Sequence, residues 1–365
     1  MATYEGLLRK SRHPDWRGLI DNILRKGTPR RVHHMELFHD IEIRAALCER
    51  FGLTKGASPA DRWFPLRQMI AADRFCGWDY VVGGLSGCGH ALHRTPTADT
   101  AALQRAGGRA FQDEHTGPIM SWDDFHKYAW PDPNASDAAE GLEWVQENLP
   151  EGMCIIGGLL GHFAEELSWL MGYETLCYAL HDNRGLVTAI AQRLWDFHEA
   201  ILRRILQYDR VKMVWASDDM GFKTSLLISA ADMREFILPG HKRLAAISHA
   251  AGRPYLLHAC GKLDDIIDEL IDDVKIDAKH SFEDTIEDVR QVKHTYGRRT
   301  ALIGGIDVDF LCRGEEKAIR RRVRETLDAC LPGGGYCLGT GNSVANYIPL
   351  DNYLAMVDEG MLYGS

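Results

Sequence analysis

Long apolar runs are missing from this sequence. No stretch of its 365 residues approaches the roughly 20 consecutive apolar residues that a membrane-spanning helix needs. The first residues, MATYEGLLRKSRHPDW, also lack the apolar core of a secretory signal. These absences argue against a membrane protein and predict a cytoplasmic location.

A block of basic residues is also absent. The chain carries 52 acidic and 42 basic side chains, a net charge of -10. A surface that tracks the phosphates of nucleic acid needs clustered Lys and Arg, so nucleic acid is excluded as the expected partner. Small molecules or another protein fit this charge better, and a homodimer stays open as the assembly.

Cysteine is present but not in a disulfide pattern. Its nine positions are irregularly spaced, and their number is odd in a long sequence without a signal peptide. This usage predicts reduced thiols, some of which can ligate a metal.

Short apolar runs alternate with longer amphipathic segments along the chain, as in repeated strand–helix units. The predicted strands are 31–38, 79–84, 153–158, 211–217, 254–260, 274–279, 300–307 and 335–341. The predicted helices are 40–52, 59–74, 161–172, 180–208, 229–250, 262–272, 283–296 and 314–330. This α/β pattern predicts a single (β/α)8 TIM barrel over residues 1–365, with extra N-terminal helices.

Residues 85–150 interrupt this alternation after the second predicted strand and show no clear strand of their own. A loop of this length in a compact domain is usually functional or disordered. Trp122, Tyr128 and Trp130 make it too aromatic for disorder. We expect a lid or pocket wall over the carboxyl-terminal mouth of the barrel; a purely structural subdomain is the alternative.

Polar side chains gather where the predicted strands end, which is the active face of a barrel. They are Glu36, Asp218, Asp219, His258, Cys260, Asp277, His280, Glu283, Asp307 and, within or after the last strand, Cys337 and Asn342. This set is richer in metal-ligand types than stability alone requires.

His258 and Cys260, in the stretch LLHACGK, are two residues apart on a strand. Such side chains project to the same side, about 6.6 Å apart along the chain, close enough to share one ion. Zinc favours imidazole and sulfur and needs a third ligand, which Cys337 can offer from the last strand. The spacing alone leaves open a second interpretation, two buried core residues without a metal.

The sequence HAC, followed by a cysteine 77 positions later, resembles the zinc signature of methylcobamide:coenzyme M methyltransferases within the uroporphyrinogen decarboxylase superfamily. The resemblance extends to segments 216–244, 277–289 and 333–353. It implies a (β/α)8 barrel and zinc held by His258, Cys260 and Cys337. Glu283 is the expected fourth ligand, with His280 and Glu36 as rivals.

The implied activity is zinc-dependent transfer of a methyl group between a small substrate and a separate corrinoid (cobalamin) protein. The chain itself has no Asp-x-His-x-x-Gly corrinoid motif. The aromatic insertion tilts the expectation slightly toward O-demethylation of a methoxylated aromatic. The alternatives are a methylcobamide:thiol methyltransferase, a metal-free decarboxylase or lyase of the superfamily, and a zinc-stabilised binding barrel without catalysis.

Individual roles follow from these positions. Asp219 and His280 are the candidate catalytic acids that protonate a leaving group. Glu36, Asp218, Phe222 and Asn342 are the candidate substrate-binding residues, and the pair Asp218–Asp219 has a structural alternative as the cap of the turn that follows it. Acidic residues after the first strand, Glu36 and Asp40, would repel the carboxylates of uroporphyrinogen.

Overall fold

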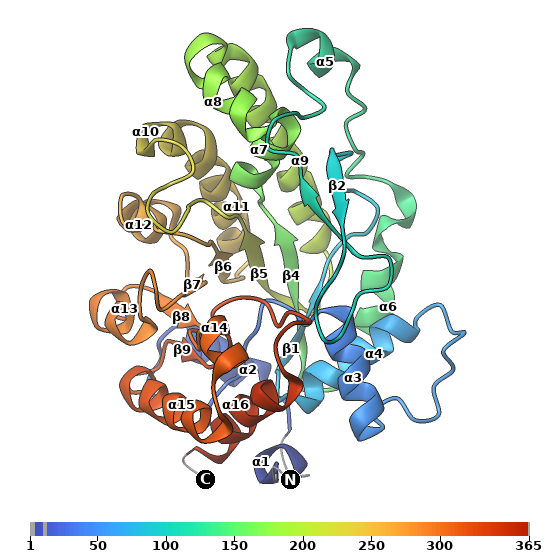
Figure 1. Cartoon of the computed structure of the whole chain (residues 1–365), viewed down its shortest axis with the longest axis vertical. Helices are drawn as coiled ribbons and strands as arrows, with labels where there is room; N and C mark the ends of the chain where they lie inside the picture. The colour runs from blue at the N-terminus through green and yellow to red at the C-terminus, as the bar shows by residue number, and fades with distance from the viewer. Residues whose placement is uncertain (1–3, 10–12, 364–365) are drawn as a thin grey trace.

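Seven parallel strands form the curled central sheet of the protein, which a computed structural model describes over residues 4–9 and 13–363. In sheet order the strands are β1 (Tyr80–Gly83), β4 (Cys154–Leu160), β5 (Val211–Ser217), β6 (Tyr255–His258), β7 (Ala278–His280), β8 (Ala301–Ile303) and β9 (Tyr336–Cys337). The strands stand at the centre of the molecule, and helices surround them (Figure 1). The expected α/β barrel is confirmed.

Residues 31–38, predicted as the first strand, close the barrel without forming a regular strand. His34 bridges Trp78, beside β1, and Leu338, beside β9, in parallel on both sides. The backbone N–H of Met35 donates to the Leu338 oxygen at 2.9 Å. The ladder stops at Glu36 because the Tyr80 hydroxyl accepts from its N–H and donates to its C=O. A side chain thus occupies the backbone groups that a longer strand would use.

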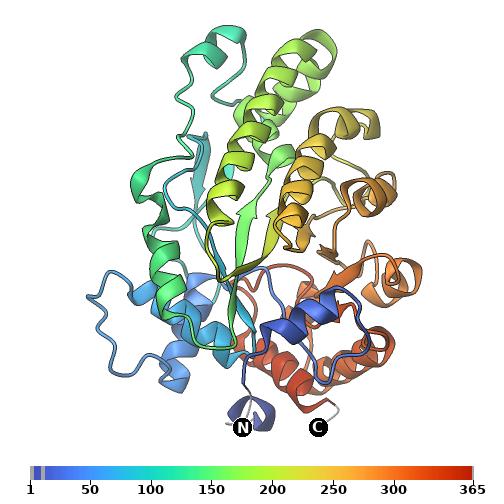
Figure 2. The same cartoon turned by 180° about the vertical axis from the view of Figure 1, so that it is seen from behind.

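Helices follow the strands as predicted and cover the outside of the sheet (Figure 2). The α-helices are α1 (Glu5–Leu8), α2 (Trp16–Ile23), α3 (Ile41–Phe51), α4 (Phe64–Phe75), α5 (Trp122–Lys127), α6 (Glu140–Asn148), α7 (Phe163–Met171), α8 (Tyr173–Asp182), α9 (Arg184–Ile205), α10 (Ala230–Asp232), α11 (Leu238–Ala250), α12 (Ile267–Glu269), α13 (Val289–Tyr296), α14 (Val308–Arg313), α15 (Glu316–Cys330) and α16 (Leu350–Leu362). A 3-10 helix, η1 (Ser136–Ala139), and two π-helical turns, η2 (Met233–Ile237) and η3 (Leu270–Val274), complete them.

The strands bury both faces, and their side chains alternate between two cores. On β5, Met213 and Trp215 belong to one buried cluster, while Val214 and Ala216 belong to the other. On β6, Leu256 shares the cluster of Met213 and Trp215. Because side chains two apart on a strand share a face, the position of Leu256 carries His258 to that same side of the sheet.

The segment 85–150 contains regular structure that its sequence did not reveal. Two short antiparallel strands, β2 (Arg94–Thr97) and β3 (Arg109–Gln112), form a ribbon. All four residues of β2 are exposed, so the sequence shows no apolar alternation there. Arg105, between the two strands, pairs with Asp40 at 3.2 Å and with Glu42 at 3.0 Å, which fixes the ribbon to the start of α3.

Several aromatic residues of this segment pack against one another and against the buried core. Tyr128 and Trp130 have ring centroids 5.0 Å apart, and Trp130 lies edge-on to Phe125 and His90. Ordinary packing therefore accounts for much of this aromatic content. Among the described residues, no helix is long and apolar enough to span a membrane.

The closure of the barrel depends on the absence of a side chain at Gly339. A β-carbon there would collide with the backbone oxygen of Met35, in the closing segment. We expect Gly339→Ala to lower the free energy of unfolding by at least about 2 kcal/mol, because backbone atoms must move to relieve the overlap. Urea denaturation measures this change. Gly89→Ala, where a β-carbon meets nothing within 4 Å, is the control and should be nearly neutral; equal stabilities of the two variants would contradict the role of Gly339.

Candidate functional site

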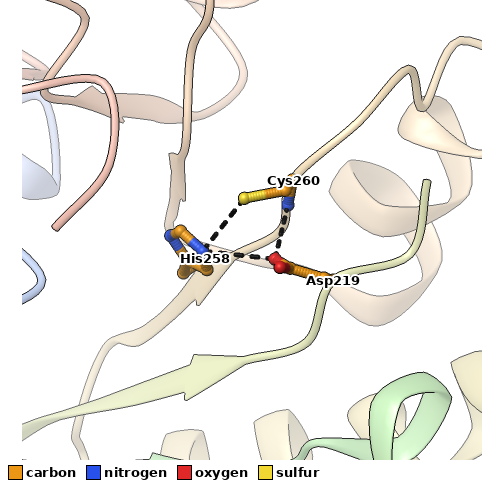
Figure 3. Close-up of side chains that lie close together, drawn as sticks. All are labelled: Asp219, His258 and Cys260. Atoms are coloured by element: carbon orange, nitrogen blue, oxygen red, sulfur yellow. Dashed lines mark hydrogen bonds and ion pairs between the residues drawn. The ribbon is translucent and has the colours of Figure 1, made fainter. Parts of the chain in front are cut away.

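Three side chains of different chemistry meet at the carboxyl ends of β5 and β6 (Figure 3). Asp219 follows β5, His258 ends β6, and Cys260 lies two residues further on. One ligand atom from each lies within 4.8 Å of the others. His258 Nε2 is 3.3 Å from both Asp219 Oδ1 and Cys260 Sγ. Oxygen, nitrogen and sulfur donors therefore face one point.

Close backbone contact between the two loops brings these residues together. Gly261, just after Cys260, has φ +92°, and a β-carbon there would collide with the backbone of Gly221. Glycine is needed for both reasons. The loop after β6 thus lies directly on the loop after β5, and the Cys260 N–H donates to Asp219 Oδ1 at 3.1 Å.

His280, at the end of β7, lies fully buried beside His258. The Nδ1 atoms of the two rings are 2.7 Å apart, and His280 Nε2 is 3.3 Å from the backbone oxygen of Thr340. Burial, with a smaller contribution from the charge of His258, holds the pKa of His280 well below its ordinary value of 6.5. His280 is thus a neutral ring without access to solvent. A direct catalytic contact with substrate, as the sequence suggested, does not fit this position.

Glu36 lies on the segment 31–38 that closes the barrel. Its carboxyl group contacts Thr340 and does not line a cavity. Its carboxyl accepts from the Thr340 N–H at 2.9 and 3.0 Å and lies 2.5 Å from the Thr340 hydroxyl. Burial raises the pKa of Glu36 to about 8, although the Thr340 bonds oppose this. The predicted substrate-binding role of Glu36 is therefore corrected to a structural one.

The protonated form of Glu36 also satisfies the hydrogens of this contact. The Thr340 hydroxyl lies against both Glu36 Oε2 and the backbone oxygen of Asn342. A hydroxyl has a single hydrogen and can donate to only one of them. When it donates to the Asn342 oxygen, a neutral Glu36 supplies the second hydrogen.

The Cys260 thiol is partly buried among polar groups. Burial, followed by the charge of Asp219, raises its pKa above the ordinary value. The side-chain amide of Asn342 donates to Cys260 Sγ at 3.3 Å. The orientation of that amide is fixed because its oxygen accepts from the Ser343 N–H at 2.7 Å. Asn342, predicted to bind substrate, thus lies at the site and faces Cys260.

The carboxylate of Asp219 is held in its charged form. Burial alone would disfavour the charge, but the hydrogen bond and positive charge of His258 outweigh it and lower the pKa of Asp219 to about 2. Its side chain remains 44% exposed, in contrast to 4% for His258. Asp219 is therefore far more accessible to solvent and small molecules than His258.

Cys337 does not join the other expected zinc ligands. It is fully buried in the barrel core, and its sulfur accepts from Asn22 Nδ2 at 3.3 Å. Asn22 also binds the backbone of Tyr336 and Gly335, so Cys337 is tied to α2. Asn342, five positions after Cys337, is the residue of this segment that contacts Cys260. Within the described residues, the side chains whose possible ligand atoms converge are therefore Asp219, His258 and Cys260, and Cys337 of the expected set is not among them.

Asp218 and Phe222 were also expected to bind substrate. Asp218 is fully buried, accepts from the N–H groups of Ala164 and Glu165 at the start of α7, and lies 2.9 Å from His241 Nε2. It is the cap of a helix and not a substrate contact. Phe222 is 49% exposed on the loop after β5, edge-on to Tyr173.

Glu283 lies beside the three-residue group and lines a cavity of about 660 Å³. Its negative charge adds to the rise in the Cys260 pKa, but it is not among the side chains whose ligand atoms converge. The other lining residues include the aromatic Phe282, Phe310 and Tyr347, the carboxylates of Asp284, Asp307 and Asp309, and Asn342. Through Asn342 this cavity adjoins Cys260.

One pair near the site escaped the sequence analysis. His162 and Glu165, at the start of α7, are 2.7 Å apart. Burial opposes the charge of His162, but the hydrogen bond and charge of Glu165 raise its pKa to about 9. Burial raises the pKa of Glu165, and the nearby charges of Asp219 and Asp218 add to the rise. The signal was present in GHFAEE, directly after β4, where the rule that selected Asp219 applies equally.

A parallel barrel with polar groups converging at the carboxyl ends of its strands has the arrangement of a barrel enzyme. The model of the uroporphyrinogen decarboxylase (URO-D) family matches residues 114–360, more than half of the chain. The chain belongs to the uroporphyrinogen decarboxylase family.

Two further proteins are similar to it. The methylated-thiol–coenzyme M methyltransferase of Methanosarcina mazei is 33% identical over 135 residues, which are 37% of this chain and 34% of that protein. The chain thus spans about a third of the length of this curated relative. A solved methyltransferase from Methanosarcina mazei matches with a TM-score of 0.69 and 15% identity, over 95% of this chain and 98% of its own. At that identity the likeness establishes the fold.

The cap formed by Asp218 predicts a large loss of stability. In Asp218→Ala, buried N–H groups of α7 and the His241 ring lose their acceptor, which should cost about 2–4 kcal/mol of unfolding free energy. Asp219→Ala is the control: its half-exposed carboxylate should cost about 1 kcal/mol or less. Urea denaturation without added metal measures both. A smaller loss at Asp218 than at Asp219 would contradict the assignment of the cap.

The raised pKa of Glu36 predicts a pH-dependent stability. Its pKa moves from 4.5 to about 8 on folding, so the folded chain keeps a proton that the unfolded chain releases between these values. Stability therefore falls as pH rises through this window, by up to about 1.4 kcal/mol per pH unit. Glu36→Gln keeps a neutral group at every pH. Its free energy of unfolding should therefore rise relative to that of the parent between pH 5 and pH 8. Denaturation at each pH tests this, and parallel curves for the two proteins would refute it.

Proposed function

We propose that this protein is a zinc-dependent methyltransferase that moves a methyl group between a small substrate and a separate corrinoid protein. The observation that carries the proposal is the convergence of Asp219, His258 and Cys260 at the mouth of a URO-D family barrel. The methyltransferase relative and the shared barrel support it.

The donor set fits zinc by its chemistry. Imidazole nitrogen, thiolate sulfur and carboxylate oxygen are the three ligand types that zinc takes in proteins. A thiolate and a carboxylate together balance the charge of the divalent ion. Three protein ligands also leave one position of a tetrahedral ion for a substrate, which is typical of catalytic sites. When bound, zinc would act as a Lewis acid that ionises a substrate thiol or stabilises the leaving group of a methyl donor.

The surrounding residues prepare this site. Asn342 donates to Cys260 Sγ at 3.3 Å, and Ser281 Oγ lies 3.6 Å from the same sulfur, so both can stabilise its thiolate. The His162–Glu165 pair, within electrostatic range of Asp219, holds a proton that can serve a leaving group. The corrinoid protein would supply the cobalt centre that gives or takes the methyl group.

The cavity beside Cys260 argues against a polycarboxylate substrate. Glu283, Asp284, Asp307 and Asp309 line it, against the single cation Arg313. Such a lining repels the carboxylates of uroporphyrinogen, so we place this chain outside the decarboxylases of its family. A methylated thiol is the substrate class that the relative's name supports. The rings of Phe282, Phe310 and Tyr347 in the lining favour a methoxylated aromatic as the second candidate.

Metal analysis of the purified protein tests the proposed site. We expect about one zinc per chain in the parent and little in Cys260→Ser, because a thiolate ligand is lost. Cys337→Ser is the matched control: it replaces a thiol that binds Asn22 and should keep its zinc. Zinc loss in Cys337→Ser with retention in Cys260→Ser would overturn the ligand assignment, and a zinc-free parent that takes up none would overturn the proposal.

Loss of the Co(I) absorbance of reduced cobalamin reports methyl transfer by the zinc-loaded parent. Dimethyl sulfide and 2-methoxyphenol, offered separately, represent the two substrate classes. A zinc-dependent spectral change with either compound, absent in Cys260→Ser, supports methyl transfer and names the class. No change with either compound, nor on offering methylcobalamin with a thiol, would contradict it.

A further inference from the structure

His280 has no exposed surface, yet it is one of two histidines in direct contact inside the barrel. Its ring lies between His258 and the Thr340 backbone oxygen, and edge-on to Trp215 with ring centroids 5.7 Å apart. Neither ring nitrogen reaches the cavity or the solvent. What His280 contributes must therefore pass through His258.

The partner of each nitrogen decides where the hydrogens lie. A backbone carbonyl oxygen only accepts, so His280 Nε2, at 3.3 Å from the Thr340 oxygen, carries a hydrogen. A neutral imidazole has one N–H, which leaves a lone pair on His280 Nδ1. The 2.7 Å contact between the two Nδ1 atoms then requires the hydrogen of His258 Nδ1. His258 is the donor and His280 the acceptor.

This direction determines the chemistry of the other His258 nitrogen. When a metal displaces any proton on His258 Nε2, the hydrogen on Nδ1 stays with His280, and Nε2, the atom 3.3 Å from both Asp219 and Cys260, presents its lone pair. A metal ligand needs that lone pair, and the hydrogen bond of the opposite nitrogen usually fixes the tautomer and ring orientation.

We infer that His280 is the positioning residue of the site: it holds His258 in the tautomer and orientation that direct the Nε2 lone pair toward Asp219 and Cys260. The inference rests on the proposed metal site. His280 also connects His258 to the barrel interior, because it contacts the backbone oxygen of Thr340. The N–H of Thr340 in turn donates to the Glu36 carboxyl.

Two variants of nearly equal size separate this hydrogen bond from packing. In His280→Asn the side-chain oxygen can take the place of Nδ1 and accept from His258, while His280→Leu offers no acceptor. We expect His280→Leu to bind zinc 10–100-fold more weakly than the parent, the usual effect of losing such a partner, and His280→Asn to recover most of that loss. Competition with a chromophoric chelator measures the affinities.

Cobalt(II) gives a readout independent of activity. The thiolate-to-cobalt band of the substituted protein should keep its position in His280→Asn and shift in His280→Leu, where His258 is free to turn. Equal affinities and spectra for parent, Asn and Leu proteins would overturn the inference. Equal losses in Asn and Leu would overturn it as well, since packing rather than the acceptor would then be responsible.

The tautomer can also be read without metal. Nitrogen-15 NMR of the metal-free parent, with the His258 signals identified through His258→Gln, should show His258 Nδ1 protonated. A bare Nδ1 overturns the role of His280 even when the parent binds zinc. Conversely, a protonated Nδ1 in a protein that takes up no zinc supports the hydrogen-bond assignment while the proposed function fails, so the two failures are distinguishable.

Discussion

The hydrogen bonds that close the barrel are also those that order its candidate site. The segment around His34 bridges the two edge strands, and the next residues bring the Glu36 carboxyl to the backbone and hydroxyl of Thr340. The oxygen of Thr340 in turn accepts from His280, which contacts His258. A change that opens the barrel at this seam would therefore disturb the orientation of His258, although more than one residue lies between them.

This connection works because its members are buried. In the low dielectric of the barrel interior, ionised groups are costly and hydrogen bonds strong, so each member takes the protonation state that its neighbours can satisfy. Glu36 is held neutral and His280 is held neutral. Charge is concentrated instead at the mouth, where Asp219 remains ionised and half exposed. The barrel thus presents the charged, accessible carboxylate of Asp219 at its mouth, above the buried neutral groups of Glu36 and His280.

The architecture was readable from the sequence because strand and helix periods are local. The short apolar runs VKMVWAS and PYLLHAC identified β5 with its observed bounds and β6 with one extra residue at its start and two at its end, and the spacing of His258 and Cys260 gave their common direction. Residues 31–38 look like a strand by composition, yet the Tyr80 hydroxyl, more than 40 positions away, takes the backbone groups of Glu36. The exposed ribbon strand β2 lacked any apolar signal. A local sequence pattern shows neither a contact with a distant residue, such as Tyr80, nor a strand whose residues are all exposed.

The set of candidate metal ligands was also beyond what local sequence patterns could predict. Counting residues from HAC pointed to Cys337, but height along a barrel depends on register and tilt, and the chain reaches Cys260 only at Asn342, which donates to its sulfur. In the proposed site, Asp219 would take the place that a second thiolate was expected to fill. The formal charge of the donor set is the same in both cases, since a carboxylate replaces a thiolate. The two donor sets differ in hardness and in exposure: the oxygen donor is harder than sulfur, and the Asp219 side chain is far more exposed than that of His258. In the proposed site the three side chains would leave one position of the ion open for a substrate, and the exposed Asp219 carboxylate would be the ligand nearest to solvent.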